Sequence, residues 1–183
     1  EFTAHTHLNP EEMYLGQGLD FFTHLEEGYP LEYIHNNAYF YRSHFYVNED
    51  VLIPRSETEI LVEESVKYIQ KNDVDSIAEI GIGSFCIGLS ILSEIHRPLN
   101  YWGSDISDQA LEVSHVNYFR LKSKIHSESN VEIVNSDKLE KLNQKVDFIV
   151  SNPPYIKTNQ GGVHEQTDKF EPHIALYLDD AKY

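Results

Sequence analysis

An apolar stretch that ends at two prolines constrains the fold of this chain more than any other feature. Residues 148–155 read FIVSNPPY, and an apolar run bounded by turn-forming residues is typical of a buried β-strand. The strand must end at Pro153 and Pro154, because proline has no backbone N–H to donate to a neighbouring strand. Asn152 and Tyr155 are therefore expected on a stiff loop at the carboxyl end of a strand, where ligands bind in open α/β sheets.

The two side chains beside these prolines suit a planar polar ligand. The Asn152 amide offers an acceptor oxygen and two donor hydrogens, and the Tyr155 ring offers a flat face for packing. Adjacent prolines often do no more than end a strand. With asparagine before them, an aromatic residue after them and a buried strand leading in, we interpret this stretch as a binding loop.

Strands and helices alternate along most of the chain. The apolar patterns predict strands at residues 76–80, 101–106, 131–135 and 147–151, and helices at 56–70, 85–95 and 107–124. Ser56, followed three residues later by Glu59, is expected to form a capping box at the first of these helices. Strands that alternate with helices form a parallel sheet with right-handed crossovers. The predicted fold class is therefore α/β, with a doubly wound, Rossmann-like sheet.

Two smaller segments precede this predicted core. Helix signals at Asn9-Pro10 and at residues 19–27 suggest that residues 1–30 are the remnant of an N-terminal helical domain. Residues 31–53 are aromatic and alternating, which predicts a linking β-hairpin. Its strands are expected at 38–41 and 45–47 around a turn at 42–44, with a third short strand after residue 50 and Tyr39, Tyr41 and Tyr46 as its packing surface. Residues 54–183 are then the main domain.

The composition disfavours several classes of function. The formal net charge is −16 with 14 Lys and Arg residues, whereas proteins that grip nucleic acid need clustered basic side chains. No apolar stretch approaches the roughly 18 residues that span a bilayer, and we see no secretory signal. The single cysteine fits a reducing compartment. We therefore expect a cytoplasmic protein without a membrane partner, with nucleic acid disfavoured, and we predict no metal site.

Glycine and acidic residues follow the other predicted strands. Gly81 and Gly83 lie where the first strand meets its helix, and glycine there lets the backbone approach a ligand beside unpaired helix N–H groups. Asp105 ends the second strand, where a carboxylate can bind both ribose hydroxyls. Asp137 follows the third strand and suits an adenine amino group. Each acid alone is often a helix cap, but three such strand ends together with Asn152 on a fourth predict one cofactor site.

Five stretches of the chain look like the HemK/PrmC family of protein-glutamine methyltransferases. They read VNEDVLIPRSETEILVEESV, EIGIGSFCIGLSIL, GSDISDQALEVSHVN, DFIVSNPPYI and FEPHIAL. NPPY alone is shared with enzymes that methylate amino groups in DNA, whereas IPRSETE is far more specific. The resemblance implies a class I S-adenosylmethionine-dependent methyltransferase fold. It also implies a protein substrate, namely the glutamine of the Gly-Gly-Gln motif in class 1 peptide chain release factors.

The resemblance also implies roles for individual residues. Asn152, Pro153, Pro154 and Tyr155 are expected to hold the substrate amide and to be the catalytic residues, with Asn152 also beside the cofactor. The remaining residues are expected to bind S-adenosyl-L-methionine: Gly81, Ile82, Gly83, Ser84 and Phe85 at its methionine part, Asp105 and Ile106 at its ribose, and Asp137 and Lys138 at its adenine.

The chain departs from the family pattern at a few positions. Phe85 stands where family members commonly have glycine, and a bulky side chain there is expected to crowd the methionine part of the cofactor. Ser56 replaces a usual proline, and Lys138 replaces what is often an aromatic or aliphatic residue. Because the fold expects further strands after Tyr183, we also expect this chain to be part of a longer protein.

Two other functions stay open at this point. One is an enzyme that methylates the exocyclic amino group of adenine or cytosine after flipping the base out of a duplex. The other is a degenerate methyltransferase domain that serves as a binding module. If the chain methylates a protein glutamine, a ribosomal protein is an alternative substrate to a release factor.

Overall fold

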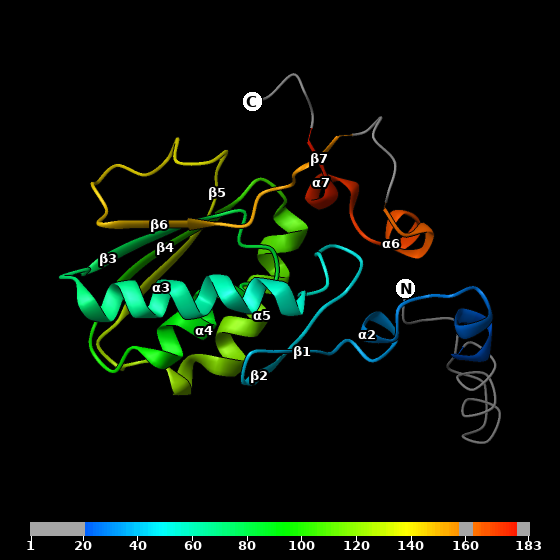
Figure 1. Cartoon of the computed structure of the whole chain (residues 1–183), viewed down its shortest axis with the longest axis horizontal. Helices are drawn as coiled ribbons and strands as arrows, with labels where there is room; N and C mark the ends of the chain where they lie inside the picture. The colour runs from blue at the N-terminus through cyan, green and yellow to red at the C-terminus, as the bar shows by residue number, and fades with distance from the viewer. Residues whose placement is uncertain (1–20, 158–162, 179–183) are drawn as a thin grey trace, which may run out of the picture.

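A parallel β-sheet forms the centre of the molecule. The computed structural model describes residues 21–157 and 163–178, and among these the central sheet has the strand order β5-β4-β3-β6 (Figure 1). Its strands are β3 (Ser76–Ile80), β4 (Asn100–Asp105), β5 (Asn130–Asn135) and β6 (Phe148–Ser151). All neighbouring pairs run parallel, so the predicted α/β class and parallel sheet are confirmed.

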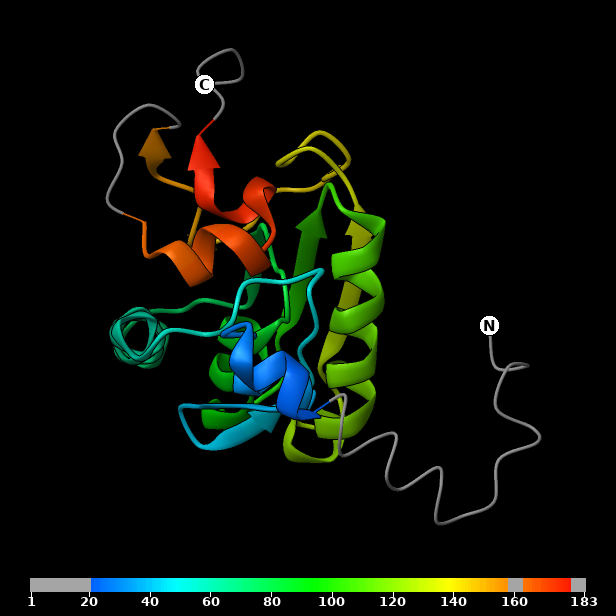
Figure 2. The ribbon, with the colours of Figure 1, turned by 90° about the vertical axis from the view of Figure 1, so that its right-hand side faces the viewer.

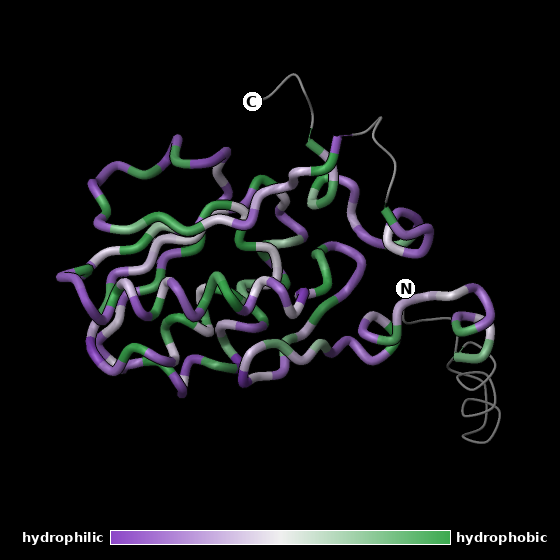
Figure 3. The backbone as a smooth tube through the Cα atoms, viewed as in Figure 1, coloured by the Kyte–Doolittle hydropathy of each residue, from purple (hydrophilic) through white to green (hydrophobic). Residues whose placement is uncertain are grey.

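Helices precede β3 and connect β3 to β4 and β4 to β5, in the expected order. They are η1 (Ser56–Thr58), α3 (Glu59–Lys71), α4 (Cys86–Glu94), α5 (Asp108–Leu121) and η2 (Lys122–Lys124). Every residue from Cys86 to Leu92 of α4 is buried, and α3 packs on α4 while α5 packs along β4 and β5. Hydrophobic and hydrophilic residues alternate along α3 (Figure 3), as expected for a helix with one buried face.

The carboxyl ends of the strands are level with one another. Ile80 at the end of β3 pairs in register with Ser104 of β4 and Ser151 of β6, and Asp105 of β4 pairs with Asn135 of β5. The loops that follow these residues therefore leave the sheet at one edge. This alignment brings the four predicted strand-end motifs together.

Residues 21–53 form a small aromatic layer beside α5. Residues 21–26 are helical and are followed by α2 (Leu31–Ile34), β1 (Ala38–Phe40) and β2 (Ser43–Phe45). Tyr33, Val47 and Val51 of this layer pack in one buried cluster with Val113 of α5. The Asn117 amide joins the layer to the core, since it exchanges hydrogen bonds of 2.7 and 2.8 Å with the Tyr46 backbone and donates to the Ser84 carbonyl.

The last residues that the structure describes form short elements near the carboxyl edge of the sheet. They are β7 (Ile156–Lys157), α6 (Glu165–Phe170), α7 (His173–Leu176) and β8 (Tyr177–Leu178), with β7 and β8 paired in parallel. Within residues 21–157 and 163–178, no helix is long and apolar enough to cross a membrane. In the same part of the chain, no group of His, Cys, Asp and Glu is arranged to hold a metal ion.

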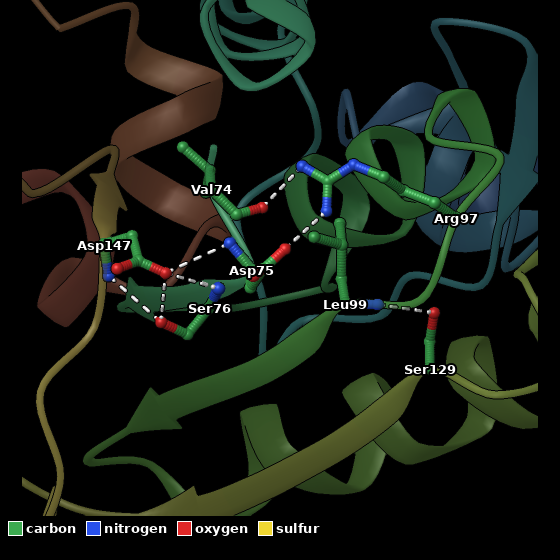
Figure 4. A network of polar contacts seen from close by, with 7 residues as sticks. All are labelled: Val74, Asp75, Ser76, Arg97, Leu99, Ser129 and Asp147. Carbon is green, nitrogen blue, oxygen red and sulfur yellow. Dashed lines mark hydrogen bonds and ion pairs between the residues drawn. The ribbon is translucent and has the colours of Figure 1, made fainter. Parts of the chain in front are cut away.

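The opposite, amino edge of the sheet is held by a polar network (Figure 4). Asp147 accepts hydrogen bonds of 2.7 to 3.0 Å from the hydroxyl and backbone N–H of Ser76 and from the backbone N–H of Asp75. Arg97 pairs with Asp75 at 2.9 Å and donates to the carbonyl of Val74. The network therefore joins the starts of β3 and β6.

The predicted capping box and hairpin details are wrong. The Glu59 carboxylate accepts the backbone N–H of Tyr41 at 2.8 Å, and no side-chain cap bond forms at the start of η1 or α3. Tyr41 has φ 55° and lies in the turn beyond the paired residues of β1 and β2, where its N–H is available to Glu59. Phe40 pairs with Ser43, so the turn is Tyr41-Arg42 rather than residues 42–44.

Other expectations for the N-terminal segments have mixed outcomes. Residues 51–55 have no strand structure, so the third short strand is wrong. Tyr39 is 63% exposed and packs only edge-on against His44 across the hairpin, with ring centroids 5.2 Å apart. Tyr41 and Tyr46 each pack against a buried cluster. The helix predicted at 19–27 is confirmed for residues 21–26, and the helix start at Asn9-Pro10 lies outside the described residues.

Candidate active site

A cavity lies at the carboxyl edge of the sheet, where the four strand-end motifs meet. Most of the predicted site residues line it: Gly81, Ile82, Gly83, Ser84, Asp105, Ile106, Asp137, Lys138, Asn152, Pro153 and Pro154. Two predicted residues, Phe85 and Tyr155, do not. The cavity therefore combines most of the predicted cofactor residues with most of the predicted substrate loop.

The glycine loop presents its backbone to this cavity. Gly81 and Gly83 have φ of 70° and 49°, a conformation that side chains disfavour. A Cβ atom added at either position would meet no atom within 4 Å, so the space beside this backbone is open. The loop is fixed from behind, since the N–H groups of Gly81 and Ile82 donate to the Ser104 carbonyl at 2.8 and 3.0 Å.

Asp105 is oriented by the backbone on both of its carboxylate oxygens. Its Oδ2 accepts the N–H of Gly83 at 3.0 Å and its Oδ1 accepts the N–H of Ser107 at 3.0 Å. Each carboxylate oxygen has a further lone pair for another donor. The side chain is therefore held in one place at the cavity and can still accept two hydroxyl groups.

The loop after β5 adds a second acid and a cation to the lining. The backbone of Lys138 is left-handed, with φ 49°, and its carbonyl accepts the Ser104 hydroxyl at 2.9 Å. The N–H of Ser136 donates to the Asp105 carbonyl at 3.0 Å. These bonds fix the turn that carries Asp137 and Lys138 into the lining.

The loop after β6 supplies the amide and the prolines. The Ser151 hydroxyl donates to the Ile80 carbonyl at 2.8 Å, which ties the end of β6 to the start of the glycine loop. Asn152, Pro153 and Pro154 then line the cavity. Tyr155 is 78% exposed and lies outside the lining.

Phe85 does not crowd the cavity, contrary to the prediction. Its φ of 63° is left-handed, and its side chain is fully buried with the ring centroid 5.5 Å from that of Tyr101. The ring is therefore part of the hydrophobic core. Its neighbour Cys86 does line the cavity, but burial raises the pKa of this thiol to about 12, so it stays protonated and is a poor nucleophile.

Sequence reasoning missed one wall of the cavity. This wall consists of Asp50, Val51, Leu52, Pro54, Arg55 and Thr58 together with Ile174 and Ala175. The available signals were the stretches IPRSETE and FEPHIAL, which carried the resemblance but to which no function was given. They lie more than a hundred residues apart, and only the folded chain brings them together.

A comparison with protein-family models agrees with this geometry. The model described as "Methyltransferase small domain" matches residues 57–169, which include the glycine loop, Asp105 and Asn152. The chain belongs to the methyltransferase small domain family. The match covers all four strands of the central sheet. The methyltransferase domain therefore forms most of the cavity, whereas the lining residues before Thr58 and after position 169 lie outside the match.

Curated proteins related to this methyltransferase domain have closely similar names. The "Release factor glutamine methyltransferase" of Flavobacterium psychrophilum is 36% identical over 163 residues, which are 85% of this chain and 54% of that protein. The protein of the same name in Clostridium acetobutylicum is 36% identical over 170 residues, which are 91% of this chain and 58% of that protein. The chain spans about half the length of the curated relatives that it matches.

A solved structure supports the fold of this methyltransferase domain. The hMettl16 catalytic domain, in complex with a 3'UTR hairpin, matches with a TM-score of 0.54 and 14% identity. The match covers 74% of this chain and 51% of that one. At this identity the likeness concerns the fold alone, which is the Rossmann-like methyltransferase fold.

Proposed function

We propose that this domain transfers a methyl group from S-adenosyl-L-methionine to the side-chain amide nitrogen of a glutamine, the one in the Gly-Gly-Gln motif of class 1 peptide chain release factors. The observation that carries the proposal is the name shared by relatives that are 36% identical over most of the chain. The cavity supports it, because Asn152 and the two prolines share it with the glycine loop.

The residues of the cavity suit the proposed cofactor. The open backbone at Gly81 and Gly83 leaves room for the methionine part, and the fixed carboxylate of Asp105 can accept the ribose hydroxyls. Asp137 and Lys138 would lie at the adenine. When bound, the cofactor supplies an activated methyl group on a sulfonium.

The chemical problem in this reaction is the weak nucleophile. The lone pair of an amide nitrogen is delocalised into its carbonyl, so orientation toward the methyl group matters more than a strong base. In the proposed mechanism the Asn152 side-chain oxygen and the Pro153 carbonyl would accept hydrogen bonds from the two amide protons and would orient the nitrogen toward the methyl donor. These acceptors also stabilise positive charge as it develops on nitrogen, and one proton leaves to water afterwards. Tyr155, exposed beside the cavity, would contact the protein substrate outside it.

The proposal extends to the domains and the compartment. Residues 1–30 would belong to an N-terminal helical domain, residues 31–53 would link it to the core, and residues 54–183 would form the methyltransferase domain. A release factor acts in translation termination, so we place the reaction in the cytoplasm. The single cysteine of the chain fits that reducing compartment.

Intact mass of a purified release factor tests the proposed function. The complete protein that contains this chain is incubated with S-adenosylmethionine and the release factor, with a ribosomal protein and duplex DNA as parallel acceptors. We expect one added methyl group on the release factor, mapped to the Gly-Gly-Gln glutamine. A methyl group on duplex DNA alone would support the amino-methylating alternative. No transfer to any acceptor, together with no detectable binding of the cofactor, would favour a degenerate binding module.

A further inference from the structure

One wall of the cavity is built by segments outside the central sheet. The loop at residues 50–58 contributes Pro54, Arg55 and Thr58, and α7 contributes Ile174 and Ala175. Figure 2 shows α6 and α7 gathered near the carboxyl ends of the strands. Neither segment is part of the four-stranded central sheet. The pairing of β8 with β7 holds the carboxyl end of α7, and the rest of the wall depends on contacts between the side chains and backbone of the two segments.

Glu171 joins the two segments directly. It follows α6 and precedes Pro172, the N-cap of α7. One carboxylate oxygen accepts the backbone N–H of Ile53 at 3.0 Å, and the other forms an ion pair with the Arg55 guanidinium. A single side chain therefore holds both halves of the wall. Glu171 lies 116 residues after Arg55 and 118 residues after Ile53 in the sequence.

Burial makes this ion pair different from a surface pair. The Glu171 side chain is 2% exposed, whereas the Arg55 side chain is 35% exposed and lines the cavity. Loss of either charge leaves the other without its partner. The cost is larger when the guanidinium is lost, because the carboxylate that remains is buried. One carboxylate oxygen contacts the guanidinium and the other accepts the Ile53 N–H. Because hydrogen bonds are directional, this arrangement favours one placement of the two segments.

Other contacts hold the same region without this pair. The Tyr33 hydroxyl donates to the Val51 carbonyl at 2.7 Å, and the Tyr29 ring packs edge-on against Phe170 at 5.1 Å. Ile53, Val51 and Tyr33 also lie in one buried cluster. Loss of the ion pair is therefore expected to shift the wall rather than to release it.

We propose that Arg55 and Glu171 are positioning residues whose ion pair sets the placement of the cavity wall formed by residues 50–58 and 172–175. The inference rests on the proposed function, since the wall would direct the substrate amide toward the methyl donor. Glu171 does not line the cavity, so it acts through Arg55 and the backbone of Ile53. Misplacement of a substrate by about 1 Å lowers turnover strongly without a matching loss of affinity.

The test uses Glu171→Gln, Arg55→Gln, Arg55→Lys and the Glu171→Gln/Arg55→Gln double variant in the complete protein. Glutamine at 171 keeps an acceptor for the Ile53 N–H and removes the charge. We expect each glutamine variant to lower kcat about 10- to 100-fold, with KM for the release factor and Kd for the cofactor changed less than about threefold. The double variant should lose no more than either single variant, and Arg55→Lys should recover part of the loss.

An exposed ion pair elsewhere provides the matched control. Arg42 and Glu94 pair at 2.9 Å with side chains 71% and 22% exposed, and neither lines the cavity. Arg42→Gln and Glu94→Gln are expected to leave kcat unchanged. If Glu171→Gln lowers thermal stability but leaves kcat per folded molecule unchanged, the positioning role is overturned. If the wild-type protein methylates no glutamine, the proposed function itself fails.

Discussion

The ring of Phe85 occupies the space that a side chain on Gly88 would need. A Cβ atom at Gly88 would lie 2.2 Å from Cε2 of Phe85, and 2.5 Å from side-chain oxygens of Glu79 and Tyr101. Each residue is unfavourable where it stands, because Phe85 adopts a left-handed conformation and glycine inside a helix costs about 1 kcal/mol relative to alanine. The two unfavourable choices support each other, since the ring fills the volume that glycine leaves.

We therefore predict strong coupling between these two positions. Phe85→Gly should destabilise the fold by about 2–4 kcal/mol, because the cavity left by the ring outweighs the relief of backbone strain. Gly88→Ala alone should also destabilise, by about 1–3 kcal/mol from overpacking. The double variant should be more stable than the sum of the single effects by at least about 1 kcal/mol. Chemical denaturation measures all four free energies of unfolding, and additive effects would contradict the prediction.

Glu79 should make stability fall as the pH rises. Burial raises the pKa of Glu79 from 4.5 to about 8, although the hydrogen bond from the Tyr101 hydroxyl at 2.7 Å opposes the change. The folded state thus holds this proton more tightly than the unfolded state. The resulting stability is fully present below the unfolded pKa and is lost as the pH rises through about 8, with a slope of at most about 1.4 kcal/mol per pH unit.

The variant Glu79→Gln tests this pH dependence. Glutamine keeps an acceptor for the Tyr101 hydroxyl but has no proton to lose. The free energy of unfolding of the wild-type protein should fall more steeply than that of the variant between about pH 5 and pH 8. Parallel curves for the two proteins would show that Glu79 has no raised pKa. Glu112→Gln, on the exposed side of α5, serves as a control.

Asp147 should make the stability of the fold decrease as the pH falls, which is the opposite of the effect of Glu79. Its pKa is lowered, first by the Ser76 hydroxyl and then by the backbone N–H groups of Asp75 and Ser76 (Figure 4). A lowered pKa means that the stabilisation is present above the ordinary value of 3.8 and is lost as the pH falls through the folded value. Asp147→Asn should therefore lower Tm at neutral pH, and the difference from wild type should shrink in acid. Asp73→Asn, at an exposed neighbouring position, should leave Tm unchanged.

The order of strands and helices could be predicted because its signals are local. The strand boundaries predicted from apolar runs and turn-forming residues agree with those of β3, β4 and β6 to within a residue. The same signals predict where the strands end, and parallel strands bring their ends to one edge. For this reason most of the predicted cavity residues, such as Gly83, Asp105 and Asn152, line one cavity.

What could not be predicted depends on competition between distant groups. The local sequence predicts that the Glu59 carboxylate bonds near Ser56, but in the structure it accepts the N–H of Tyr41. Phe85 could face the cavity or the core, and its left-handed backbone turns the ring to the core. The ion pair of Arg55 with Glu171 likewise has no local signature, since its partners are 116 residues apart.

In the complete protein, substitution of Asn152 should mainly lower turnover, whereas substitution of Asp105 should mainly weaken cofactor binding. In the proposed mechanism Asn152 orients the substrate amide, so Asn152→Ala should lower kcat by about 100- to 1000-fold and change the Kd for S-adenosylmethionine less than about threefold. In the same proposal Asp105 accepts the ribose hydroxyls of the cofactor, so Asp105→Ala should raise that Kd about 10- to 100-fold, as loss of a charged hydrogen bond predicts.

Calorimetry of cofactor binding and mass spectrometry of the methylated release factor measure the two effects independently. Asp105→Ala also removes acceptors for the Gly83 and Ser107 N–H groups, so Tm must be recorded beside Kd. Asp105→Asn, which keeps acceptor capacity, is expected to bind the cofactor with intermediate affinity. If Asn152→Ala weakens cofactor binding as much as it slows turnover, Asn152 holds the cofactor rather than the substrate, and the orienting mechanism is wrong.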